Sequence, residues 1–135
     1  MRRADDLVRV CAEPAGTRAV IIEEDGVVAY AYLRDGDALV GDVWLYNVGA
    51  DPASVDWHDP ALMPFCNPAA YCGDAPLPRL RDDAVVKCRW SERGALVVID
   101  GVPWALLERD ARPGWSRNAR VAGPLARPLR ERLMP

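Results

Sequence analysis

Two apolar runs, residues 19–24 and 27–33, are rich in β-branched and aromatic side chains and flank an Asp-Gly dipeptide at 25–26. Asp-Gly between two such runs predicts a β-hairpin, because a two-residue type I′ turn needs positive φ at both central residues. A loop of this length would place Val20 opposite Ala31. Both faces of the hairpin would be largely apolar, so we expect it to occupy a central position in a sheet.

A third strand is expected over residues 38–48, because a second Asp-Gly pair at 35–36 predicts another tight turn. This turn would place Tyr30 opposite Gly41, where the tyrosine ring has room above the bare backbone. Gly41 is equally typical of a β-bulge. The three strands together predict an antiparallel meander.

A second meander is predicted over residues 84–108, where three short apolar runs are separated by turn signals. The pairing implied by these turns lines up Cys88, Val97 and Trp104 across one face. Pro103 has no N–H to donate to a neighbouring strand, so its strand should lie at an edge or carry a bulge.

We interpret the chain as a flexible N-terminal segment, 1–16, followed by a single β-rich domain, 17–135. An apolar patch at 7–11 offers an extra strand within the first segment. Inside the domain, a proline-rich excursion over 49–82 contains several aromatic residues, so we expect it to be ordered and to lie over the sheet. An arginine-rich tail, 109–135, completes the domain.

Short helices are expected in two places, near 68–71 in the excursion and over 124–133 in the tail. Pro128 would break an interior turn of the tail helix, so two short pieces are the alternative there. A turn is expected at 113–115. The predicted fold is therefore mainly β, with α+β as the alternative: two antiparallel meanders form a sandwich or a partly open barrel. Twelve prolines and ten glycines in 135 residues interrupt the chain too often for a helical bundle.

The apolar segments of the chain limit the cellular compartment and the membrane partners that we expect. No run approaches the ~18 apolar residues of a membrane helix, and the N-terminus lacks the apolar core of a signal peptide. We therefore expect a cytoplasmic protein that has no membrane partner.

Charge is divided unevenly along the chain. Residues 1–76 hold five arginines against thirteen acids, a net charge of −8, and residues 77–135 hold twelve basic residues against seven acids, a net charge of +5, which together give −3. We expect the tail arginines to pair with the acids of the first half. A pI of about 5.1 argues against a nucleic-acid partner, because dedicated binders lie above about 9.

The four cysteines show no metal-binding pattern. Cys11, Cys66, Cys72 and Cys88 are separated by 54, 5 and 15 residues, without the C-x-x-C pair that zinc sites usually contain. We predict no metal and no cofactor. Cys88 lies in a predicted strand and should behave as a small buried hydrophobe.

An enzymatic alternative depends on His58, the single histidine, which lies between Asp56 and Asp59. Carboxylates on both sides would stabilise an imidazolium, as a general acid or base requires. Cys66 is a candidate nucleophile nearby in the sequence. In this alternative the protein is a small hydrolase that uses His58 with a neighbouring Asp or Cys in a cleft under the excursion.

A binding alternative combines the excursion with exposed acids of the first meander. Tryptophan, tyrosine and arginine are the residues that dominate interface energetics. The candidate binding residues are Trp44, Tyr46, Trp57, His58, Asn67, Tyr71 and Trp115.

Five motifs resemble those of a family of small uncharacterised bacterial proteins: 22–26 (IEEDG), 29–33 (AYAYL), 41–47 (GDVWLYN), 63–68 (MPFCNP) and 113–116 (PGWS). The resemblance covers residues 19–118. It implies a compact bacterial domain and brings no catalytic residue with it. Small acidic bacterial proteins of this kind include binding and inhibitory partners such as immunity proteins.

These observations favour a non-enzymatic domain that binds a protein, with an inhibitor of the immunity type as one form. The hydrolase is the alternative. A nucleic-acid-binding module that uses the arginine-rich tail is the third hypothesis.

Overall fold

A computed structural model describes residues 7–24, 28–47, 80, 83–119, 122 and 125–130. Most of the excursion over 49–82 lies outside the described residues, together with the helix expected at 68–71 and the turn expected at 25–26. In the part of the chain that is described, no helix is long and apolar enough to cross a membrane.

The described residues form nine strands in two sheets. The strands are β1 (Leu7–Ala12), β2 (Arg18–Glu24), β3 (Val28–Asp35), β4 (Ala38–Asn47), β5 (Val86–Trp90), β6 (Gly94–Ile99), β7 (Val102–Glu108), β8 (Ala111–Ser116) and β9 (Arg127–Pro128). The first sheet has the order β1-β2-β3-β4 and the second has the order β5-β6-β7-β8-β9.

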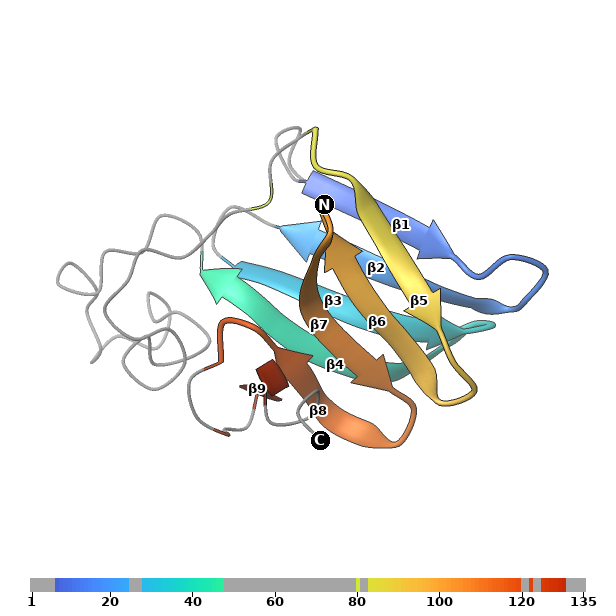
Figure 1. Cartoon of the computed structure of the whole chain (residues 1–135). Coiled ribbons are helices and arrows are strands. Elements are labelled where there is room, and N and C mark those ends of the chain that lie inside the picture. Colours follow the sequence, from blue (N-terminus) through green and yellow to red (C-terminus); the bar gives the residue numbers. More distant parts are fainter. Residues whose placement is uncertain are drawn as a thin grey trace, which may run out of the picture.

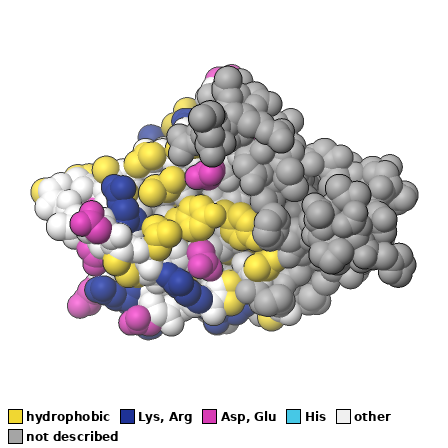
Figure 2. All heavy atoms as spheres, turned by 180° about the vertical axis from the view of Figure 1, so that it is seen from behind, with side chains coloured by type: hydrophobic (Ala, Val, Ile, Leu, Met, Phe, Trp, Pro, Cys, Tyr) yellow, Lys and Arg dark blue, Asp and Glu magenta, His cyan; other side chains and the backbone are white. Residues whose placement is uncertain are grey.

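The two sheets pack face to face (Figure 1), and Figure 2 shows the molecule from the side of the first sheet. Neighbouring strands are antiparallel except for β8 and β9, which are parallel. The prediction of a mainly β fold built from two antiparallel meanders is therefore confirmed.

The hairpin of β2 and β3 forms with a register that differs by two residues from the expected one. Val20 lies opposite Leu33 rather than Ala31. Register follows the length of the connection, and four residues separate the last described pair, Glu24 and Ala29. An even shift leaves every side chain on its predicted face, so the apolar side chains remain buried. β1 and β4 flank the hairpin, which confirms its central position.

The pairing of β3 with β4 is irregular near Gly41. Leu33, not Tyr30, lies opposite this glycine, and the register shifts between Leu33 and Arg34. The bulge that we considered for Gly41 is therefore confirmed. A Cβ atom at Gly41 would lie 3.2 Å from the backbone oxygen of Glu108 in β7, so the glycine also allows the two sheets to approach closely.

The second sheet confirms part of the expected pairing. Cys88 lies opposite Val97, as predicted. Val97 pairs with Ala105 rather than Trp104, because the register shifts directly after Val97. This irregularity is the bulge expected at Pro103, and it allows β7 to lie inside the sheet, between β6 and β8, despite the missing N–H.

Strands outside the two meanders extend both sheets. Leu7–Ala12 belong to the first sheet as β1 rather than to a flexible segment, which confirms the strand considered there. The turn expected at 113–115 is wrong, because these residues lie within β8. A Cβ atom at Gly114 would lie 2.5 Å from the backbone oxygen of Leu106 and 3.2 Å from the Cβ of Val43, so only glycine lets β8 run this close to its neighbours.

The helix expected over 124–133 is wrong at Arg127–Pro128, which form β9 beside β8. Proline disfavours the interior of a helix, since its ring clashes with the preceding turn and it has no N–H. Leu129 and Arg130, directly after β9, have helical geometry, but no helix is among the elements that the described residues form.

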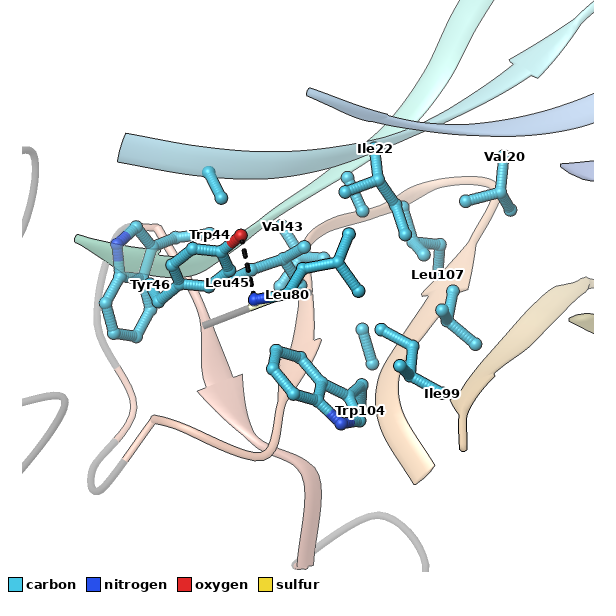
Figure 3. Packing of buried hydrophobic residues seen from close by; sticks show 14 of the residues in the cluster. Val20, Ile22, Val43, Trp44, Leu45, Tyr46, Leu80, Ile99, Trp104 and Leu107 are labelled. Carbon is cyan, nitrogen blue, oxygen red and sulfur yellow. Dashed lines mark hydrogen bonds between the residues drawn. The ribbon is translucent and has the colours of Figure 1, made fainter. Parts of the chain in front are cut away.

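The hydrophobic core lies between the sheets (Figure 3). Ile22, Leu33 and Val43 from the first sheet and Val97 and Leu107 from the second are all completely buried or nearly so. Burial of an aliphatic side chain of this size contributes about 1.5–3 kcal/mol. The apolar inner faces of the two sheets thus bury each other. Each sheet also has an outer face, which points away from the other sheet.

Candidate functional site

Two candidate binding residues, Trp44 and Tyr46, are 0% and 1% exposed. The Tyr46 hydroxyl donates a hydrogen bond to the Glu24 carboxylate. It also accepts one from the Leu80 N–H at 3.3 Å (Figure 3). Its ring packs edge-on against Trp104, with ring centroids 6.1 Å apart. Trp44 and Tyr46 therefore belong to the core. Aromatic composition alone does not separate a core from an interface.

Not all acids of the first meander are exposed. Glu24 is 2% exposed, because strand alternation places it on the inner face with Val20 and Ile22. Burial of a carboxylate is costly unless hydrogen bonds compensate it. The Tyr46 hydroxyl is one such donor, so Glu24 has a structural role in the core.

Trp115 is half-buried on β8 and holds β9 in place. The Arg127 guanidinium lies 3.9 Å from the centroid of the Trp115 ring, and its Nε and Nη2 atoms donate to the Pro113 carbonyl at 3.0 and 2.5 Å. Trp115 belongs to the second sheet, whereas Trp44 belongs to the first.

Two tail arginines join the second sheet to acids of the first half, which confirms the pairing that we expected. Arg109 lies 3.6 Å from a carboxylate oxygen of Asp35, and Arg112 lies 3.8 Å from one of Asp42. Arg112 also donates a hydrogen bond to the Leu39 carbonyl. Exposed ion pairs of this kind contribute about 0–1 kcal/mol each.

The other candidate residues lie outside the described residues. They are the hydrolase candidates Asp56, His58, Asp59 and Cys66 and the binding candidates Trp57, Asn67 and Tyr71.

The outer face of the first sheet carries two adjacent rows of side chains. In one row Val10 lies opposite Ile21, which lies opposite Tyr32, which lies opposite Asp42. Side chains of opposed residues in neighbouring strands point to the same side of a sheet, so these four residues are neighbours. The first three form a continuous apolar row across β1, β2 and β3.

The second row lies one step further along the strands. Val8 lies opposite Glu23, Glu23 opposite Tyr30, and Tyr30 opposite Trp44. The rings of Tyr30 and Tyr32 stack along β3 with centroids 6.0 Å apart, which connects this row with the first. We call Val8, Val10, Ile21, Tyr30 and Tyr32 together the outer apolar face.

The outer apolar face is accessible. Val10 is 58% exposed, and the other four side chains are partly exposed. Figure 2 shows hydrophobic side chains gathered in a band over this face, with acidic and basic side chains beside them. The second sheet covers only the inner face of the first. The outer apolar face is therefore a continuous hydrophobic surface held by three paired strands.

Charged side chains border this face at different corners. Glu23 lies in the row of Val8 and Tyr30, and Arg34 is exposed one step beyond Tyr32 along β3. Asp42 lies at the β4 end of the first row. Acidic and basic groups on separate sides give the face an orientation that a flat apolar patch would lack.

The residues of this face were missed as site residues, although the sequence carries their signal. Both faces of the β2–β3 hairpin are apolar in the sequence, which we interpret as the mark of a central hairpin. The hairpin is central within its sheet but meets the other sheet on one side only. An apolar second face is therefore the signal that identifies the site.

A separate cluster at the turns is structural. Arg18 donates to Glu13 at 2.5 Å, to the Ser91 carbonyl at 2.8 Å and to the Glu92 carbonyl at 3.2 Å, and its guanidinium lies 5.1 Å from the centroid of a Trp90 ring. The side-chain hydrogen bond from Arg18 lowers the pKa of Glu13 below its ordinary value. Arg18 thereby ties the first sheet to the turn between β5 and β6.

Among the described residues, no group of three or more His, Cys, Asp and Glu side chains is arranged to hold a metal ion. In comparisons with known proteins, no family model, curated protein or solved structure matches the chain. The resemblance over residues 19–118 therefore stays a prediction.

Proposed function

We propose that this protein is a non-enzymatic binding module that recognises another protein through the outer apolar face. The observation that carries this proposal is the continuous, accessible row formed by Val10, Ile21 and Tyr32 across three paired strands. Contiguous exposed apolar surface has an unfavourable contact with water and often marks a protein interface.

The residue types favour a protein partner. Tyrosine supplies a large amphipathic contact area at a low cost in conformational entropy, because it has only two side-chain torsions. The stacked rings of Tyr30 and Tyr32 restrict each other further. Flanking aliphatic side chains would exclude water around such anchors, as the surroundings of interface hot spots do.

The strand framework also favours binding without rearrangement. Val10, Ile21 and Tyr32 belong to strands that pair on at least one side, and β2 and β3 pair on both. A preformed face loses little freedom when a partner docks, so more of the contact energy is available for affinity. The partner that fits is a protein with a flat apolar patch and an acidic group placed to meet Arg34.

An inhibitor of the immunity type is one form of such a module. It would occupy the functional surface of its target with the outer apolar face. This narrower function is a hypothesis that identification of the partner would decide.

Site-specific photo-crosslinking in cells of the native host tests the proposal. A photoreactive amino acid replaces Val10 in one variant and Lys87, which is exposed on the second sheet, in the control variant. We expect a single protein to be crosslinked from position 10 and not from position 87, and the crosslink to disappear when Tyr32→Asp is added. Equal labelling from both positions, or no crosslink from position 10, would contradict the proposal.

A further inference from the structure

The two free thiols among the described residues lie on the edge strands of the two sheets. Cys11 is in β1, at one edge of the first sheet, and Cys88 is in β5, at one edge of the second. The two strands lie side by side (Figure 1), and their Cα atoms approach within 8 Å. Each thiol is only partly buried.

Two hydrogen bonds fix how these strands are aligned. Arg9 Nη2 donates to the Ala84 carbonyl at 2.6 Å, and Cys11 Sγ donates to the Val86 carbonyl at 3.5 Å. Each bond joins residues that are 75 positions apart in the sequence. An advance of two residues along β1 therefore corresponds to an advance of two residues along the segment that contains β5. Cys88 follows Val86 by two residues and so points to the same side of its strand.

The two thiols also affect each other. Burial raises the pKa of the Cys88 thiol, and the neighbouring Cys11 thiol raises it further through its charge and a hydrogen bond. The protonated form of Cys88 is therefore favoured.

We propose that Cys11 and Cys88 form a disulfide bond across the edge of the two sheets when the protein meets a small-molecule disulfide such as oxidised glutathione. Both cysteines are free thiols, and the Arg9 and Cys11 hydrogen bonds already hold their strands in alignment. Cys11 contacts the Val86 carbonyl, two residues before Cys88, so closure joins residues whose strands already lie together.

The reaction is two successive thiol–disulfide exchanges. The Cys11 thiol loses its proton, and its sulfur attacks the small disulfide, which gives a mixed disulfide on Cys11 and releases one small thiol. Cys88 then loses its proton and attacks the Cys11 sulfur, which releases the second small thiol. Two protein thiols are oxidised, one small disulfide is reduced to two thiols, and a Cys11–Cys88 bond remains. Cys11 attacks first because Cys88 is held in its protonated form, and the thiolate is the nucleophile.

The bond would close a loop of 77 residues between the sheets. A loop of this length strongly restricts the unfolded chain, so we expect the oxidised protein to melt roughly 10 °C above the reduced one. Oxidation would thus cross-link β1 and β5 reversibly at the edge where the two sheets meet.

The test uses the chain with Cys66→Ser and Cys72→Ser, in which only Cys11 and Cys88 remain of the four cysteines. The folded protein is incubated with oxidised glutathione and analysed by intact mass, by non-reducing peptide mapping and by melting. We expect the loss of two hydrogen atoms, a peptide pair linked through Cys11 and Cys88, and a higher melting temperature that dithiothreitol reverses.

Two further variants test the order of attack, and one further measurement covers the case in which the serine substitutions prevent folding. With Cys88→Ser added, the exchange should stop at a glutathione adduct on Cys11, and with Cys11→Ser added the adduct on Cys88 should form at least ten-fold more slowly. If the double-serine chain does not fold, peptide mapping of the unaltered chain gives the same answer. Glutathione adducts on both cysteines, or a linked peptide only in denaturant, would overturn the proposal.

Discussion

The hydroxyl of Tyr46 donates a hydrogen bond to the carboxylate of Glu24 in the interior of the protein, where both side chains are at most 2% exposed. The same hydroxyl accepts a hydrogen bond from the Leu80 N–H at 3.3 Å. The pair connects β2 with β4 across β3 and anchors residue 80 to the core. The Glu24 carboxylate therefore stabilises the core and does not contribute to the protein surface.

This relationship predicts a large loss of stability when the hydroxyl is removed. Tyr46→Phe should lower the free energy of unfolding by about 2 kcal/mol, because a hydrogen bond to a buried carboxyl group is lost and the polar groups it served stay buried. Urea denaturation measures the change. In a double-mutant cycle with Glu24→Gln, the two substitutions should be coupled by about 1 kcal/mol or more. Simple additivity of the two effects would show that the contact contributes nothing.

The close passage of β8 predicts that Gly114 cannot be enlarged. Gly114→Ala would place a Cβ atom 2.5 Å from the Leu106 backbone oxygen, and backbone atoms inside a sheet cannot move aside cheaply. We expect a loss of about 1–3 kcal/mol in the free energy of unfolding. The matched control is Leu39→Ala at a side chain that is 52% exposed, which should change it by less than about 0.5 kcal/mol. An alanine at position 114 that is as stable as glycine would contradict the packing of β8 described above.

The Glu13–Arg18 pair predicts a dependence of stability on pH. The pKa of Glu13 is lowered in the folded protein from its ordinary value of 4.5 by the hydrogen bond from Arg18. The folded state therefore binds this proton less tightly than the unfolded state, so the pair stabilises the protein above the ordinary pKa. This contribution is lost as the pH falls through the lowered pKa.

Glu13→Gln measures this contribution directly. The difference in unfolding free energy between the unaltered protein and this variant should be largest near neutral pH and should shrink steadily below pH 4.5. A difference that is constant from neutral to acid pH would show that ionisation of Glu13 contributes nothing to the pair.

The hydrolase hypothesis makes an opposite prediction for His58. If the protein is a binding module that uses the outer apolar face, His58→Ala should leave the affinity for the crosslinked partner within a few-fold, as measured by calorimetry. If His58 were a general acid or base, the substitution would abolish turnover of a substrate. Hydrolytic activity that depends on His58 would favour the alternative.

Local sequence signals predicted the strands of the two meanders. The features that they did not predict depend on packing between residues far apart in the sequence. The runs on either side of residues 25–26 and the run at 38–48 gave the first three paired strands, because alternation and turn residues act over short distances. The faces of β2 and β3 were predicted correctly although their register differed by two residues. The faces of β4 were not, because its register with β3 differs by three residues near Gly41 and shifts again between Ala29 and Tyr30, which separates Trp44 from Tyr46. Pro103 likewise predicted its bulge, since the missing N–H is a local property.

The sequence could not show which of the candidate binding residues are buried, because burial depends on how distant parts of the chain pack. Tyr46 and Glu24 have the composition of an interface, yet they lie on the inner face of the first sheet, where they are buried and joined by a hydrogen bond, and Trp44 is buried as well. Residues 113–115 look like a turn in isolation and lie in β8, because Gly114 permits a close approach that no local pattern records. The pairing of Cys11 with Cys88 joins residues 77 positions apart and has no signal in their spacing.

The central claim is that a partner protein docks on the outer apolar face, and affinity measurements on matched surface variants test it most directly. Val10→Asp and Lys87→Asp each put an aspartate at an exposed strand position, on the first and second sheets respectively. Circular dichroism first confirms that both variants fold. With the purified partner, Val10→Asp should weaken binding by at least about ten-fold, because burial of an unpaired charge at an interface costs more than 1.4 kcal/mol. Lys87→Asp should leave the dissociation constant within two-fold, and equal effects of the two substitutions, or no effect of Val10→Asp, would contradict the claim.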